Sequence, residues 1–468
     1  MTRVKLLFLV FLLPAVLSTT AIAQKQPPPE GGQPKDFELP AKETFTLDNG
    51  MRVTMVPFGT LPKLLARVVM RVGNLNESAD EVWLADMTAE MLKEGTSTRD
   101  AQTIATEAAS MGGSVEVSVG TDQSWVGGDV LSEFSPDLVR LLADIVRHPS
   151  FPEAEFMRLR KDMIRDLSIA KTRARNLARE KFRQVLYSDH PYGRPYPTEE
   201  MLENYTLDDV RNFYETNFGA LRTHLYVVGK FDTKAVEMAV RQAFGGWTDG
   251  AEPLIKIPSP VSERKVYLVD RQDAPQTTIY FGLPVIDPTQ KNYSALEVTN
   301  TLLGGYFSSR ITANLREDKG YTYSPRSSLS TRFRDTYWVE VADVNTEATG
   351  ASLKEITYEI DRLQAEPVSE EELTGVQNYM AGNFVLQNSS RSGIVGQLVY
   401  MDLHGLSDEY LNNYVKIIYS VTPADVQRMA NEILEDENMT IVLVGDVKTI
   451  RRQVEPYGEV VDEVTNDE

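Results

Sequence analysis

The chain has 468 residues, a formal net charge of −20 and no cysteine. The absence of cysteine excludes disulfides, thiolate metal sites and cysteine nucleophiles. A surface this acidic argues against binding to nucleic acid or to an anionic membrane. A preference for basic peptides is compatible with this charge, although acidity is common among proteins that have no such preference.

Residues 1–23 have the pattern of a secretory signal peptide. Two basic residues precede an apolar run, Leu6–Leu17, and Ala21-Ile22-Ala23 offers the small residues that a signal peptidase accepts. The run is shorter than the roughly 20 residues that a membrane-spanning helix needs, and no cysteine follows it for lipid attachment. Residues 24–39 are rich in Pro, Gly and Gln and predict a disordered lead-in. We therefore expect an exported protein, either periplasmic or secreted.

Segments with strand-like alternation and segments with helical periodicity are interspersed along the rest of the chain. The predicted strands are 45–56, 64–72, 114–119, 265–270, 277–283 and 337–344. The predicted helices in the first half are 82–93, 103–111, 137–146 and 153–170. Strands and helices do not alternate regularly, as they would in a parallel doubly wound sheet. The pattern predicts an α+β fold with mainly antiparallel sheets packed with helices.

An internal repeat divides the chain into halves. Thr206 and Thr422 each begin a helical segment and have an acidic residue three positions later, which is a capping-box pattern. Each segment leads into an apolar strand that ends at Gly229 or Gly445, and both pairs are 216 residues apart. We predict two homologous α+β domains. Their predicted boundaries are 40–250 for the first domain, 251–262 for a linker and 263–462 for the second domain.

Residues 73–96, GNLNESADEVWLADMTAEMLKEGT, resemble a known family. They are similar to the insulinase/pitrilysin zinc peptidases (inverzincins), in which G-x-x-x-E precedes a G-L-A-H-x-x-E-H helix and then M-L-F-K-G-T. The segments 190–195 (HPYGRP) and 270–282 resemble further parts of the same family. The resemblance covers essentially all of the mature chain. It implies two like domains that together form a half-shell.

The helix that should carry the metal motif lacks its chemistry. A zinc hydrolase of this kind needs two imidazoles one helical turn apart, a carboxylate ligand and a general base, and H-x-x-E-H supplies most of these on one helix. By the resemblance, those motif positions are Asp86, Ala89 and Glu90, and the third ligand falls at Asp166. The methyl group of Ala89 cannot accept a proton. We therefore expect no metal on this chain and no independent peptidase activity.

The acidic residues at these positions allow two interpretations. Asp86, Glu90 and Asp166 could form an all-oxygen site for a hard cation such as Ca²⁺ or Mg²⁺. Alternatively they are remnants of a decayed site, solvated or paired with Arg or Lys, and this is the interpretation that we favour. No two of the chain's histidines share a helical turn, so we expect each to be structural or exposed. These histidines are His148, His190, His224 and His404.

The second half keeps a different part of the family pattern. Residues 304–324, GGYFSSRITANLREDKGYTYS, resemble a family segment in which an Arg and a Tyr, seven positions apart, reach towards the zinc site. The match places them at Arg316 and Tyr323. We expect Arg316 to end a helix, Gly320 to form a tight turn and Tyr323 to begin a strand, so that both side chains converge. Both can donate hydrogen bonds to a substrate carbonyl and to the oxyanion that forms from it, although each also occurs in such places for structural reasons alone.

In the same segment, we also predict roles for Tyr321 and for the glycine pair Gly304-Gly305. Strand alternation would put Tyr321 on the same face as Tyr323, where it could share its role. The glycine pair Gly304-Gly305 is expected to lie in a flexible loop over the substrate cavity, although paired glycines often form a plain turn.

Some members of the family divide the work between two chains, and this chain resembles the member that lacks H-x-x-E-H. The resemblance implies a non-catalytic subunit that pairs with a homologous zinc-bearing chain, as a heterodimer or larger assembly, and acts on peptides. The zinc is then expected on the partner, and none on this chain. A first alternative is an inert peptide-binding or scaffold protein of the same fold. A second is an independent hydrolase that uses the carboxylates.

Overall fold

The computed structural model describes residues 37–462, so the predicted signal peptide 1–23 and most of the lead-in 24–39 lie outside the described residues. The last residues of that lead-in belong to the folded chain. Leu39 is 8% exposed, and its N–H donates to Asn412 Oδ1 at 2.8 Å. Within residues 37–462, no helix is both long enough and apolar enough to cross a membrane.

The first half builds a six-stranded sheet in the order β1-β2-β6-β3-β5-β4. Strands β2 and β6 are parallel, and all other neighbours are antiparallel. The prediction of one strand over 45–56 is wrong, because Asp48-Asn49-Gly50 turns the chain into a hairpin, with Gly50 at φ 83°. The strands are β1 (Glu43–Thr46), β2 (Arg52–Pro57), β3 (Lys63–Met70), β4 (Val115–Val119), β5 (Ser124–Leu131) and β6 (Thr223–Gly229).

The second half has a sheet in the order β12-β7-β11-β8-β10-β9, which repeats the first sheet except that its outer strand β12 is parallel to β7, whereas β1 is antiparallel to β2. Strands β7 and β11 are parallel, as β2 and β6 are, and the next three pairs are antiparallel in both sheets. Thr206 and Thr422 cap equivalent helices with capping boxes, so the predicted duplication is confirmed. The strands are β7 (Lys265–Asp270), β8 (Gln276–Val285), β9 (Arg326–Arg332), β10 (Asp335–Asn345), β11 (Thr440–Gly445) and β12 (Glu459–Asp462).

Helices cover both faces of the two sheets, and residues 251–262 carry neither helix nor strand. The helices of the first half are α1 (Leu84–Leu92), α2 (Ala101–Ser110), α3 (Ser135–Arg147), α4 (Glu153–Lys171), α5 (Ala174–Tyr187), α6 (Glu199–Asn204), α7 (Leu207–Asn217) and α8 (Thr233–Phe244). Those of the second half are α9 (Tyr293–Asn300), α10 (Arg310–Thr312), α11 (Thr349–Ala365), α12 (Glu370–Gln387), α13 (Arg391–His404), α14 (Asp408–Ser420), α15 (Pro423–Ile433) and α16 (Val447–Val454).

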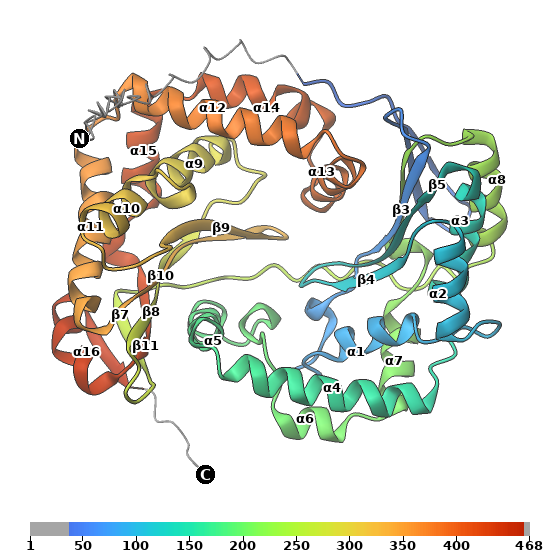
Figure 1. Ribbon diagram of the computed structural model, residues 1–468, viewed down its shortest axis with the longest axis horizontal. Coiled ribbons are helices and arrows are strands. Elements are labelled where there is room, and N and C mark those ends of the chain that lie inside the picture. Colours follow the sequence, from blue (N-terminus) through green and yellow to red (C-terminus); the bar gives the residue numbers. More distant parts are fainter. Residues whose placement is uncertain (1–36, 463–468) are drawn as a thin grey trace, which may run out of the picture. The chain divides into compact units, whose positions relative to one another are not determined.

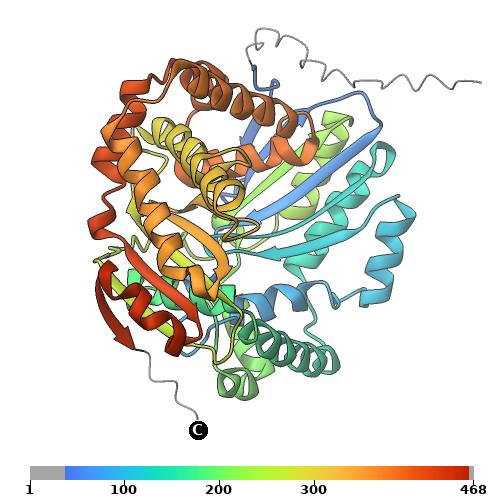
Figure 2. The same cartoon turned by 60° about the vertical axis from the view of Figure 1, so that its left-hand side comes forward.

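Each sheet buries one face against helices of its own half and the other face against helices of the opposite half. Helices α12, α13 and α14 place Phe384, Leu398 and Val415 in one cluster with Val69 and Val228 of the first sheet. Among them, α13 contacts strands β3 and β6 directly, and Figure 2 shows dark-orange helices of the second half beside the blue strands of the first.

The reverse contact is made by α5, which packs on the second sheet. Phe182 of α5 is fully buried, with its ring 5.4 Å from that of Tyr337 on β10. Because full burial of a large apolar side chain contributes roughly 1.5–3 kcal/mol, these exchanged helices account for a substantial part of the stability of each sheet.

Candidate functional site

Helix α1 carries Asp86, Ala89 and Glu90, which occupy the positions of the family's zinc motif. It lies against the edge strand β4 (Figure 1), and its N-cap residue, Trp83, has a left-handed backbone with φ 70°. Ala89 is buried, at 1% exposure. Its methyl group therefore faces protein, and no carboxylate stands at this position to activate a water molecule.

Two acids near the start of α1, Glu77 and Asp86, form a hydrogen-bonded group with Asn74. The side-chain amide of Asn74 donates to Asp86 Oδ2 at 2.7 Å and to Glu77 Oε1 at 3.1 Å. Glu77, only 6% exposed, also accepts the Ala85 N–H at 2.9 Å. Burial raises the pKa of Glu77 to about 8, and the negative charge of Asp86 adds to this shift. Burial likewise raises the pKa of Asp86.

The predicted metal-site residues do not converge on one point. Glu90 pairs with Lys93 on its own helix. The side chain of Asp166, on α4, is 62% exposed and lies 3.7 Å from Arg165. Over residues 37–462, no three His, Cys, Asp or Glu side chains are placed to hold a metal ion. These residues do not fit zinc, and the all-oxygen cation site has no support in this geometry.

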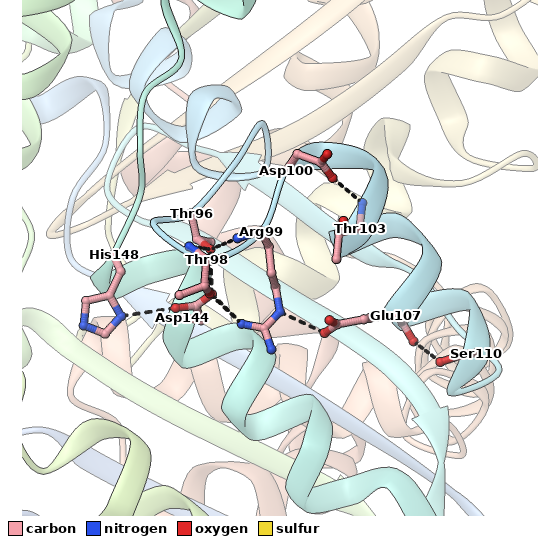
Figure 3. Close-up of polar contacts among 9 residues, drawn as sticks. All are labelled: Thr96, Thr98, Arg99, Asp100, Thr103, Glu107, Ser110, Asp144 and His148. Atoms are coloured by element: carbon pink, nitrogen blue, oxygen red, sulfur yellow. Dashed lines mark hydrogen bonds and ion pairs between the residues drawn. The ribbon is translucent and has the colours of Figure 1, made fainter.

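The chain that leaves α1 is fixed by one carboxylate. Asp144 of α3 accepts the Thr96 hydroxyl at 2.7 Å and the Arg99 guanidinium at 2.7 Å, and Arg99 continues to Glu107 of α2 at 2.9 Å (Figure 3). His148 lies 3.3 Å from the other Asp144 oxygen. Burial opposes the ionisation of Asp144, but the hydrogen bonds from Thr96 and Arg99 outweigh it and lower its pKa. This network ties α1, α2 and α3 together, which is a structural role.

The Arg/Tyr segment does bring its two side chains together. Arg316 lies in the π-helical turn η6 (Ala313–Asp318), and Gly320 turns the chain at φ 66°. The guanidinium carbon of Arg316 lies 4.9 Å from the ring centre of Tyr323 and 4.4 Å from that of Phe307. Arg316 is thus held between two aromatic rings that are 79% and 67% exposed, respectively. Among the described residues, its ion-pair partner is the adjacent Glu317.

Three expectations about this segment are wrong in detail. Tyr323 does not begin a strand, because β9 starts three residues later, at Arg326. Tyr321 packs partly buried against the core of the second half, whereas Tyr323 is exposed, so the two do not share a surface. Gly304-Gly305 lies in the helical turn η5 (Thr301–Gly305) rather than in a loop.

Position 304 requires glycine because Ser327 and Glu340 pack closely against it. A Cβ atom on Gly304 would stand 2.5 Å from Ser327 Oγ and 2.9 Å from Glu340 Oε2. Any side chain there would clash, so the position requires glycine for close approach. Phe307 lies two residues beyond the glycine pair and was not identified from the sequence. A large apolar residue in a Ser-rich turn could have indicated an exposed functional side chain.

The HPYGRP segment joins the two halves. Tyr192 is fully buried, and its hydroxyl donates to Asp122 Oδ1 at 2.5 Å. The second oxygen of Asp122 accepts the Phe333 N–H at 3.1 Å, at the tip of the β9–β10 hairpin. Arg332 lies 5.5 Å from the Tyr192 ring. This segment therefore helps to dock the second half onto the first.

Comparison with known proteins gives two family matches that together cover more than half of the chain. Residues 62–198 match the family model described as insulinase (peptidase family M16), and residues 204–380 match the peptidase M16 inactive domain. An uncharacterized zinc protease of Rickettsia bellii is 25% identical over 415 residues, covering 86% of this chain and 98% of that protein. An uncharacterized zinc protease of Bacillus subtilis is 23% identical over 379 residues, covering 79% and 90%.

Solved structures share the fold. A peptidase M16 inactive domain from Pseudomonas fluorescens superposes with a TM-score of 0.80 at 22% identity, covering 86% of this chain and 98% of that one. A protease from Helicobacter pylori gives 0.81 at 20% identity, covering 87% and 100%. With the family matches and the altered α1 motif, these findings show that the chain belongs to the insulinase family, peptidase family M16, as a member without the catalytic motif.

Proposed function

We propose that this chain is the non-catalytic subunit of an exported, heteromeric zinc metallopeptidase that acts on peptides. Its partner would be a homologous chain with an intact H-x-x-E-H motif, which carries the zinc. The observation that carries this proposal is the contact of the partly exposed Arg316 with the exposed rings of Tyr323 and Phe307, on a fold whose α1 helix has Ala89 at the position of the motif's base.

The chemistry of the group suits a contribution in trans. A guanidinium and a phenol are both hydrogen-bond donors, and donors aimed at a carbonyl oxygen stabilise the negative charge that develops during attack. The Phe307 and Tyr323 faces hold the Arg316 guanidinium by cation–π attraction, worth about 0.5–1 kcal/mol at exposed sites. Arg316 would therefore be presented in a restricted orientation while its donors stay accessible to a bound peptide.

The proposed export rests on the signal-like residues 1–23. Expression in a host with a secretory pathway should release a mature chain that begins near Gln24. N-terminal sequencing of the released protein measures this directly, and a retained Met1 in a cytoplasmic protein would contradict export.

The central test is reconstitution with the zinc-bearing partner. The chain alone should not hydrolyse peptides, and the assembled pair should. Arg316→Ala or Tyr323→Phe should lower turnover by about 10²–10³-fold, the usual cost of one lost oxyanion donor, while size-exclusion chromatography still finds the pair assembled. Arg140→Ala and Tyr358→Phe alter exposed side chains on α3 and α11 and serve as matched controls that should keep full turnover.

If both site variants support full turnover in the assembled pair, the catalytic contribution is refuted. Binding of peptide without cleavage in every combination of chains would instead support an inert peptide-binding or scaffold protein. Chelator-sensitive cleavage by the chain alone would contradict both functions.

A further inference from the structure

The second half contains a cavity that is separate from the Arg316 group. Its volume is about 630 Å³, within the range of small-molecule sites. Helices α9, α12, α13 and α14 and the edge strand β9 form its walls. The polar and aromatic side chains that line it include Tyr293, Glu297, Asn300, Asn383, Tyr400 and Tyr410.

A carboxyl group with one buried oxygen that lacks a hydrogen-bond partner among the described residues lies in this wall. Glu297 stands on α9, and its Oε2 atom is buried and makes no hydrogen bond to the described residues. Burial raises the pKa of Glu297 to about 8 and is the sole cause of that shift. Arg326, the cationic residue in the lining, has an exposed side chain and is not close enough to lower this pKa. The acid therefore faces the cavity without a counter-ion.

Aromatic rings surround this carboxyl group. Burial and the nearby Glu297 charge raise the pKa values of Tyr293, Tyr410 and Tyr414, so their hydroxyls stay neutral. Tyr414 stacks on Phe384 with ring centres 4.6 Å apart. The negative faces of aromatic rings attract cations, and quaternary or alkyl ammonium groups are recognised in such surroundings.

We propose that this cavity binds an organic ammonium ion, with the Glu297 carboxylate as its counter-ion and the tyrosine rings as its walls. An anion would face the carboxylate directly, and a neutral apolar ligand would leave the acid unpaired, which is costly in a buried site. A cation satisfies both the acid and the rings. The ammonium group belongs either to a small free cation or to a lysine side chain.

Choline is a suitable probe because its charge does not change with pH. Isothermal titration of the full chain should give binding on the order of tenfold tighter at about pH 9.5, where Glu297 is ionised, than at about pH 6.5, where it is protonated. The neutral isostere 3,3-dimethylbutan-1-ol should bind weakly at both values. Equal binding of the two compounds, or choline affinity that does not change with pH, would overturn the proposal.

Substitution separates Glu297 from other buried acids. Glu297→Gln should abolish the pH dependence of choline binding and weaken it about tenfold at about pH 9.5. Glu340 on β10 is fully buried, without a hydrogen bond to its carboxyl group from the described residues, and it lies outside the cavity lining. Glu340→Gln is therefore the matched control and should bind as the wild type does. Loss of binding in both variants, with unchanged melting temperatures, would contradict the role of Glu297.

A second probe distinguishes the two sources of the ammonium group. Nα-acetyl-lysine methylamide presents a lysine side chain without a free amino terminus. If it competes with choline, the cavity takes a basic peptide side chain, and if choline alone binds, the cavity takes a small free cation. None of these measurements needs the zinc-bearing partner, so their failure would leave the proposed function untouched.

Discussion

Phe307 packs on the Arg316 guanidinium, yet it is 67% exposed and adds little to the core. Its replacement should therefore affect the orientation of Arg316 more than folding. In the assembled pair, Phe307→Ala should lower turnover by about two- to fivefold, matching a cation–π contact of about 0.5–1 kcal/mol. Phe307→Tyr keeps an aromatic face and should retain turnover. Steady-state peptide hydrolysis by both variants measures this, and equal activity of Phe307→Ala and wild type would exclude the orienting role.

The buried carboxyl group of Glu77 should make the stability of the fold depend on pH. Its pKa is raised to about 8 from the usual 4.5, mainly by burial, so the folded state binds this proton more tightly than the unfolded state does. Below about pH 4.5 both states are protonated and the group has no effect. Between the two pKa values the folded state loses stability as pH rises, by on the order of 3–5 kcal/mol in total.

Glu77→Gln should remove this penalty while keeping the acceptor for the Ala85 N–H. The variant should match the wild type within about 1 kcal/mol near pH 5 and exceed it by several kcal/mol near pH 9. Urea denaturation at both pH values measures the difference. A variant that is less stable than the wild type at high pH would mean that the fold stabilises the ionised form of Glu77, which contradicts a raised pKa.

At the scale of elements, α13 is attached to the first sheet by a partly buried polar contact. Asp402 of α13 pairs with Arg52 and lies 3.3 Å from His224 Nδ1, and the other ring nitrogen of His224 lies 2.8 Å from the Thr54 hydroxyl. Burial opposes the ionisation of Asp402, but the His224 and Arg52 contacts outweigh it and lower its pKa to about 2.

A lowered carboxyl pKa contributes stability above the unfolded value and loses it as pH falls through the folded value. Asp402→Asn should therefore cost on the order of 2 kcal/mol at pH 7, and the difference from wild type should shrink as pH falls from about 4 to about 2. Asp408→Asn is the matched control. Asp408 pairs with Lys42 at the exposed surface, where such pairs contribute less than about 1 kcal/mol. Denaturation curves in urea compare the two, and equal losses would show that burial does not distinguish them.

Helices and strands could be predicted from the sequence where a local pattern, such as a capping box or helical periodicity, determines them. The capping boxes at Thr206 and Thr422 and the helical periodicity of α4 carried correct predictions. The β1–β2 hairpin was missed although Asn49-Gly50 is a strong hairpin signal, because the strand-like residues on both sides of it resemble one continuous strand. The helical turn at Gly304 was missed because its glycine is required by tertiary packing against Ser327 and Glu340, and local propensity contains no information about those neighbours.

The candidate site, too, could be predicted from the sequence only in part. The loss of the general base could be predicted, because it depends only on which residue occupies position 89, and that residue is Ala89. Arg316 and Tyr323 were identified by the family resemblance, and the turn at Gly320 accounts for their convergence, whereas the strand start at Tyr323, the shared face of Tyr321 and the loop at Gly304-Gly305 were predicted wrongly. The partnerless Glu297 could not be predicted, because its cavity is built from four helices and a strand that meet only in the folded chain.

At the scale of the whole molecule, the duplication predicted two like domains, but the exchange of helices between them leaves neither sheet complete alone. Val69 and Val228 on the first sheet are covered by α12, α13 and α14, and the second sheet depends on α5. Sequence periodicity indicates which faces are apolar, whereas the identity of the covering helix is a property of the tertiary fold.

This exchange predicts how separated halves behave. Fragments 37–262 and 263–462, produced singly, should each expose an apolar sheet face, bind a hydrophobic dye and melt without a cooperative transition, because large exposed apolar patches favour association. Mixed or co-expressed, they should form a one-to-one complex with the near-ultraviolet circular dichroism of the intact chain. Phe182→Ala, which empties the α5 contact and should cost about 3–5 kcal/mol, should weaken that complex far more than exposed Met238→Ala on α8. Fragments that are monomeric, cooperative and dye-negative alone would contradict the mutual dependence of the halves.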